Sequence, residues 1–67
     1  MDWSEQVVVK RLVPDETVWD GITLDVAVQR IMDLPPNERV GLTIFAQSGA
    51  YDGKQIEALF DRLRQSK

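Results

Sequence analysis

The feature that most constrains the fold of this 67-residue chain is that it contains neither cysteine nor histidine. A domain of this size buries only about 60% of the surface that its unfolded chain exposes, so disulfides or zinc stabilise many small folds. Without Cys or His, stability has to come from close packing of apolar side chains or from a bound partner. The Ser/His/Asp and Cys/His catalytic systems are excluded for the same reason.

The overall composition is typical of one small globular domain covering residues 1–67. Hydrophobic residues make up 43% of the chain and charged residues 28%, a balance well away from that of disordered segments. The net charge at pH 7 is −3. This charge argues against a general nucleic-acid binder, because neutralising phosphates requires a basic face.

Nothing in the sequence favours a membrane protein or a secreted protein. No apolar run approaches the roughly 18 residues that a membrane span requires. The N-terminal segment carries Asp2 and Glu5, whereas a signal peptide needs basic residues there. We therefore expect a cytoplasmic protein without a membrane partner.

The first segment with a clear pattern is residues 6–13, which are rich in β-branched side chains and stop at Pro14. This pattern predicts a strand, and Pro14 suits the turn that follows. Residues 17–22 then pair back as a second strand or form a loop held by a buried Trp19. Both alternatives remain open, since the acids and the glycine of this segment weaken the strand pattern.

A helix is predicted over residues 24–34, with Thr23 as its N-cap and Asp25 in its first turn. Pro35–Pro36 ends it, because a residue before proline disfavours helical backbone angles. One stripe of the helix is apolar and consists of Leu24, Ala27, Val28, Ile31, Met32 and Leu34.

Residues 40–47 alternate with the period of two that is typical of a strand. A helix beginning at Pro36 is the alternative, which Gly41 and the β-branched residues of the segment oppose. In the strand, one face would carry Val40, Leu42, Ile44 and Ala46, and the other Gly41, Thr43, Phe45 and Gln47.

The sequence of the C-terminal part predicts a loop over residues 48–53 and then a helix. Asp52 and Gln55 have the spacing of a capping box, in which each side chain bonds the other's backbone N–H. The helix that follows has one apolar stripe, formed by Ile56, Leu59, Phe60 and Leu63.

These elements predict an α+β fold, a two-layer sandwich in which two helices cover one face of a two- or three-stranded sheet. Their order is strand, an optional second strand, helix, strand, helix. If the first and last strands were parallel neighbours, their connection would be a right-handed crossover.

The count of apolar faces predicts a binding surface. If both helices cover Leu42 and Ile44, Phe45 and Thr43 lie on the opposite face, together with either Val8, Lys10 and Leu12 or Val7, Val9 and Val13. This face is either covered by Trp3 and Trp19 or serves as an interface. We expect a non-catalytic protein–protein interaction module that binds another protein or a second copy of itself. Its candidate aromatic anchors are Phe45, Trp3, Trp19 and Tyr51.

An alternative function is weak binding of phosphate or a nucleotide by residues 48–55. Gly53 and Lys54 match the end of the P-loop pattern, and Gly49 adds a second flexible position. Ser48 replaces the leading glycine of that pattern, and Gln55 replaces the hydroxyl that holds Mg²⁺. The competing interpretation is that both glycines serve the turn around a capped helix start.

A further alternative uses the acids between residues 15 and 25 to occupy the basic groove of a nucleic-acid-binding protein. The acidic patch consists of Asp15, Glu16, Asp20 and Asp25. Their spacing does not match a Ca²⁺ loop, and so small a domain has little interior for a carboxylate pair across a cleft. We therefore expect no catalytic residues, no metal and no cofactor.

Overall fold

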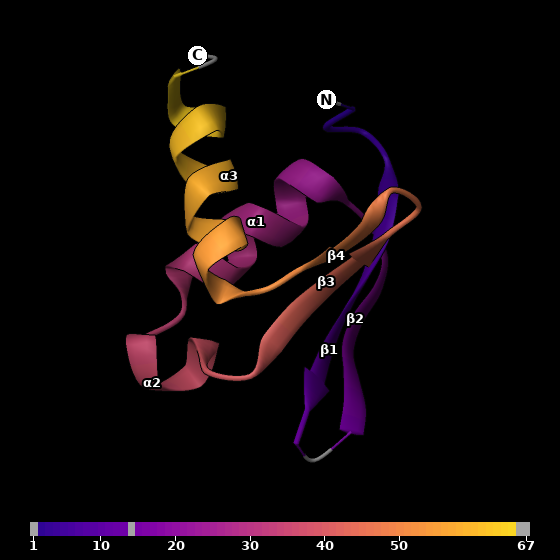
Figure 1. The fold of residues 1–67 in the computed structure, drawn as a ribbon, viewed down its shortest axis with the longest axis vertical. Coiled ribbons are helices and arrows are strands. Elements are labelled where there is room, and N and C mark those ends of the chain that lie inside the picture. Colours follow the sequence, from indigo (N-terminus) through magenta and orange to yellow (C-terminus); the bar gives the residue numbers. More distant parts are fainter. Residues whose placement is uncertain (1, 14, 66–67) are drawn as a thin grey trace.

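A computed structural model describes residues 2–13 and 15–65 of the chain. They form one antiparallel sheet of four strands, in the order β2-β1-β3-β4, with helices packed against it (Figure 1). The elements are β1 (Gln6–Leu12), β2 (Asp15–Thr23), α1 (Leu24–Asp33), α2 (Pro36–Arg39), β3 (Leu42–Ala46), β4 (Gly49–Tyr51) and α3 (Gly53–Gln65). The α+β class is confirmed, with four strands rather than two or three and with three helices rather than two.

The segment that the sequence left open is a strand, since β2 pairs with β1 along its length. The register shifts between Val7 and Val8 and again between Val9 and Lys10. At the first shift Gly21 has a positive φ of 70°, a conformation that glycine adopts without steric cost and that is common in β-bulges. The glycine that weakened the strand pattern is therefore part of how this strand pairs.

The fourth strand corrects the prediction of a loop over residues 48–53. Gly49–Tyr51 pairs antiparallel with β3, and only a short turn separates the two strands. Three residues are too few for a period of two to be detected in a sequence. The prediction was therefore wrong at these positions.

The strand predicted over residues 40–47 is confirmed as β3, although it is shorter. The alternative helix at Pro36 also exists, as the single turn α2, and it ends before β3 begins. Val40 lies between the two elements and is 74% exposed. Because β1 and β3 are antiparallel neighbours, the crossover rule does not apply to their connection.

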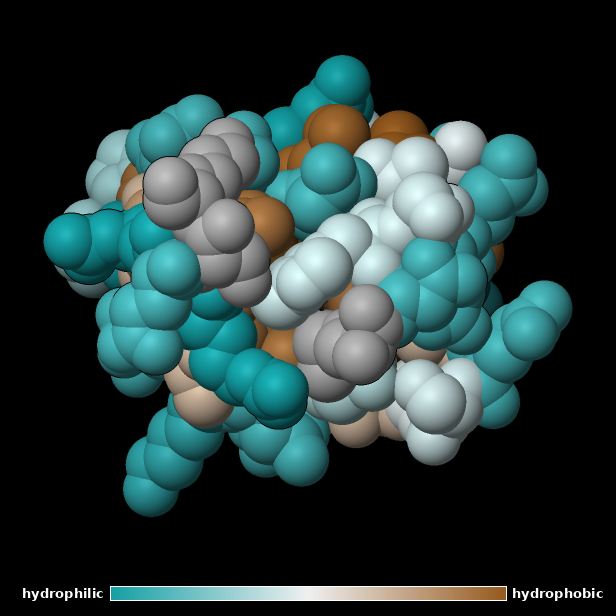
Figure 2. Space-filling model, turned by 90° about the horizontal axis from the view of Figure 1, so that it is seen from above, coloured by the Kyte–Doolittle hydropathy of each residue, from teal (hydrophilic) through white to brown (hydrophobic). Residues whose placement is uncertain are grey.

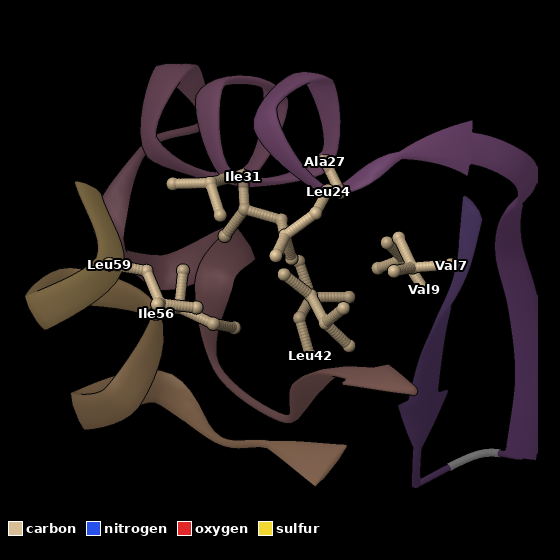
Figure 3. Packing of buried hydrophobic residues seen from close by; sticks show 10 residues of the cluster. Val7, Val9, Leu24, Ala27, Ile31, Leu42, Ile56 and Leu59 are labelled. Carbon is tan, nitrogen blue, oxygen red and sulfur yellow. The ribbon is translucent and has the colours of Figure 1, made fainter. Parts of the chain in front are cut away.

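Both long helices pack on the same face of the sheet: α1 contacts β1 and β2, and α3 contacts β3 and β4. Figure 3 shows their apolar side chains meeting those of the central strands. Each fully buried aliphatic side chain contributes about 1.5–3 kcal/mol. The core consists of Val7, Val9, Leu24, Ala27, Val28, Ile31, Leu42, Ile44, Ile56 and Leu59.

Both ends of α1 are tied to other segments. At its start, the backbone N–H groups of Leu24 and Asp25 donate to the carbonyls of Glu5 and Trp3. Thr23 is the N-cap residue as predicted, but its hydroxyl bonds the Asp25 carboxylate rather than a backbone N–H. At the far end, the Arg39 guanidinium donates to the carbonyls of Met32 and Leu34, at 3.1 and 2.8 Å, which satisfies acceptors that a helix end leaves free.

Figure 2 shows the molecule from above, relative to the view of Figure 1. This surface is mainly hydrophilic, and hydrophobic residues appear on it only in small, separate areas. Within residues 2–13 and 15–65, no helix has both the length and the apolar character that crossing a membrane requires.

Candidate interaction surface

The side of the sheet turned away from α1 and α3 is here called the outer face. Paired residues of antiparallel strands point to the same side, so the pairing of Val9 with buried Ile44 marks the inner face, and that of Val8 with Phe45 marks the outer one. The outer face consists of Gln6, Val8, Lys10 and Leu12 of β1, Asp15, Thr17, Asp20 and Thr23 of β2, Thr43 and Phe45 of β3, and Ala50 of β4.

One row of the outer face crosses all four strands. It runs from Asp20 through Val8 and Phe45 to Ala50, each paired with the next and about 4.8 Å apart from strand to strand. Phe45 in this row is 38% exposed. The row thus combines a carboxylate at one edge with an apolar centre.

A hollow of about 410 Å³ opens beside three residues of this row, Asp20, Val8 and Phe45, and we call it the Phe45 hollow. Val8 and Phe45 are among its apolar lining residues, and Asp20, Gln6 and Gln47 are its polar ones. The backbone N–H of Gln47 donates to the Glu5 carboxylate at 2.8 Å, which ties the β3–β4 turn to the N-terminal segment. The hollow is lined by Gln6, Val7, Val8, Asp20, Gly21, Phe45, Ala46 and Gln47.

The two tryptophans lie away from the Phe45 hollow. Trp19 pairs with Val9, so it shares the inner face, where the Arg30 guanidinium lies 5.7 Å from its ring centre. Trp3 packs against the core from the segment before β1, and its carbonyl accepts from the first turn of α1. Neither residue lines the hollow, so neither covers Phe45.

Tyr51 also lies on the inner face, because it pairs with Ile44. Its hydroxyl is 2.9 Å from the hydroxyl of Ser48, with which it forms a hydrogen bond. Of the four aromatic residues proposed as anchors, Phe45 is therefore the one on the outer face.

Both edges of the sheet are poorly suited to pairing with another strand. The edge strand β4 has only three residues. The other edge strand, β2, is irregular at two places and carries Asp15, Glu16 and Asp20. Short, bulged and charged edges are how native proteins avoid sheet extension. Neither edge is therefore suited to extending the sheet with a strand of a partner.

The residues proposed for phosphate binding are not gathered into one site. Gly49 begins β4 and Gly53 begins α3, so about 13 Å of extended chain separates them. The capping box is confirmed: the Asp52 carboxylate accepts from the Gln55 N–H at 3.1 Å, and Gln55 Oε1 accepts from the Asp52 N–H at 3.0 Å. The carboxylate thus lies at the helix N-terminus, where a bound anion would lie.

Lys54 lines a different, largely apolar groove of about 290 Å³ between α1, α2 and α3. Val40 and Ile56 line the same groove. This arrangement does not provide the run of backbone N–H groups that cradles a phosphate.

The four acids of the predicted patch are dispersed. Glu16 forms an ion pair with Arg11 at 3.2 Å on the inner face. Asp25 accepts from the Val26 N–H at 2.9 Å at the start of α1. Only Asp15 and Asp20 lie on the outer face, in separate rows. A continuous acidic surface is therefore not formed by these four residues.

The carboxylate of Asp2 lies in the N-terminal segment. Hydrogen bonds from the Ser4 hydroxyl, and then from the Ser4 N–H, hold the pKa of Asp2 below its ordinary value. Over residues 2–13 and 15–65, no three acidic side chains lie close enough to hold a metal ion together.

Comparison with protein-family models, with curated proteins and with solved structures found no match to this chain. The function is therefore inferred from the surface of the chain itself.

Proposed function

We propose that this chain is a small, non-catalytic protein–protein interaction module that docks its partner on the outer face of the sheet. One observation carries the proposal: Phe45 is exposed beside a hollow, while both tryptophans that were candidates to cover it pack elsewhere. Aromatic side chains, phenylalanine among them, are enriched at the cores of protein interfaces.

The surroundings of Phe45 support a protein partner. Apolar residues form the centre of the row, and Asp20, Gln6 and Gln47 lie around them, which resembles the apolar core and polar rim of an interface. Four strands about 4.8 Å apart and about five residues long give a face of roughly 300–400 Å². Specific stable complexes use about 800 Å² per partner, so the complex should be weak and exchangeable.

The same surroundings support a module without chemistry of its own. Asp20, the acid nearest to Phe45 in the row, is exposed to solvent, whereas general acids and bases are commonly tuned by burial. The partner is another protein or a second copy of this chain. The cytoplasmic location expected from the sequence stays a prediction.

Two variants test the proposal, because the chain offers a matched pair of exposed hydrophobic residues. Phe45→Ser removes the anchor, and Val40→Ser removes an even more exposed side chain that lies outside the outer face. Light scattering at two concentrations a hundredfold apart measures self-association, and affinity capture from cell extract measures binding of another protein. Circular dichroism checks the fold of each variant.

We expect both variants to fold and only Phe45→Ser to lose the associated species. Loss of folding in Phe45→Ser would instead make Phe45 a core residue. Loss of binding in Val40→Ser alone would move the interface to the groove between the helices. Either result contradicts the proposal.

A further inference from the structure

We infer that the Phe45 hollow receives a basic side chain, an arginine or lysine of a partner protein, with Asp20 as its counter-charge. This inference rests on the proposed function and adds to it the chemistry of the partner. It is carried by the order of groups along one row of the sheet.

The row matches the shape of a long basic side chain. Asp20, Val8 and Phe45 lie on neighbouring strands, so about 10 Å separates the first from the third. A side chain lying over Val8 places its methylene groups on Val8 and on the ring, while its charged end meets the carboxylate. Long basic side chains commonly bury their stems in this way, and arginine bonds a carboxylate with two parallel N–H groups.

Asp20 is available for this role, because its carboxylate has no hydrogen bond or ion pair with any other described residue. Two other acids are already engaged: Glu16 is paired with Arg11, and Asp25 accepts from a backbone N–H. Asp20 is exposed, so its carboxylate can be reached from solvent.

No base of the described chain lines the Phe45 hollow. Lys10, the one base of the outer face, lies in the next row between Thr17 and Thr43 and forms no ion pair with Asp20. The net charge of the whole chain is −3. The charge of the hollow is therefore complementary to a cation and unfavourable to an acidic partner.

The test uses three capped tripeptides that differ at the central residue: arginine, norleucine or glutamate between two glycines. Each is titrated into the ¹⁵N-labelled chain at low salt while amide chemical shifts are recorded. We expect the arginine peptide to shift the amides of Val8, Gly21 and Phe45 and to bind more tightly than the norleucine peptide. The glutamate peptide should bind most weakly.

Two variants on the same strand and face separate charge at the hollow from charge in general. Asp20→Asn should weaken arginine binding about two- to fivefold, the range expected of an exposed ion pair, and bring it to the norleucine level. Asp15→Asn makes the same change of charge outside the hollow and should leave the affinity unchanged.

The outcomes are distinct from those of the proposed function. Equal binding of the arginine and norleucine peptides, or an unchanged affinity in Asp20→Asn, overturns the inference that the hollow receives a basic side chain. This holds even if Phe45→Ser still abolishes partner binding. Shifts of the same amides on concentrating the chain alone, with none caused by peptide, identify a second copy as the occupant and also overturn it.

Discussion

The two faces of the sheet are built from adjacent residues of the same strands but differ in what covers them. On β1 and β3 the inner face carries Val7, Val9, Leu42 and Ile44, each 0–2% exposed. The outer positions Val8, Lys10 and Phe45 are not buried, whereas Thr43 of the same face is only 8% exposed. The difference shows that alternation alone makes two faces, and that the helices decide which of them becomes the core.

Only one face is covered because both long helices pack on the same side. Within the described residues, the remaining helix α2 has four residues, none of them buried. An antiparallel sheet tolerates one solvated face. The inner face therefore stabilises the domain, and no helix of the described residues covers the outer face.

The largest expected effect compares the neighbours Ile44 and Phe45. Ile44→Ala should destabilise the fold by about 2–5 kcal/mol, because it leaves a cavity in the core. A domain of this length has only about 3–10 kcal/mol of stability in total. Phe45→Ala loses a cross-strand contact, which should cost about 1 kcal/mol. Urea unfolding measures both, and equal losses would mean that the two faces do not differ as described.

A second comparison concerns Gly21, which lies at the irregularity that brings Trp19 to the inner face. Gly21→Ala should cost about 1–2 kcal/mol, because a side chain at positive φ is strained although nothing lies within 4 Å of its Cβ position. The control Gly53→Ala also has open space, but no positive φ, and it should be neutral or stabilising by up to about 1 kcal/mol. Thermal unfolding measures the stability change of each variant. An equal change in Gly21→Ala and Gly53→Ala would exclude backbone strain at Gly21.

A smaller effect is expected at the start of α3, the helix that covers β3 and β4. Asp52→Ala removes half of the capping box and should cost about 1 kcal/mol. Asp61→Ala makes the same change of charge in the middle of the helix and should change stability by less than about 0.5 kcal/mol. Denaturant midpoints of the two variants measure the difference. A cost at Asp61 as large as at Asp52 would assign the effect to net charge.

The smallest effect is expected at Asp2, in the segment before β1, whose Trp3 and Glu5 carbonyls accept from the first turn of α1. Since folding lowers its pKa, the contribution of Asp2 to stability is present above the unfolded pKa and is lost as the pH falls through the folded pKa. In Ser4→Ala the pKa of Asp2 should rise toward its ordinary value. NMR titration of the carboxylate measures this change, and an unchanged pKa would contradict the role of the Ser4 hydroxyl.

The predictable parts of the fold are those with an unbroken pattern. The helix ending before Pro35 has one apolar stripe, and β3 alternates without a bulge, so the opposite orientations of Ile44 and Phe45 could be predicted. Strand β4 could not be predicted, because three residues carry too little periodicity.

The face of Trp19 was also beyond sequence reasoning. The irregular pairing around Gly21 changes which residues of β2 point inward, because a one-residue slip exchanges the two faces of a strand. The same irregularity places Asp20 opposite Val8. The position of Phe45 in the candidate site was thus predictable, while its carboxylate neighbour was not.

The most direct test of the uncovered outer face is the amide NMR spectrum of Phe45→Glu. A carboxylate on an open face stays hydrated, whereas the same group in a packed core costs several kcal/mol unless it is paired. The described fold predicts native dispersion, with shift changes confined to the outer face around Val8, Thr43 and Ala50. Collapse of the dispersion, or changes centred on Ile44 and Leu24, would show that Phe45 belongs to the core and would contradict a free binding face.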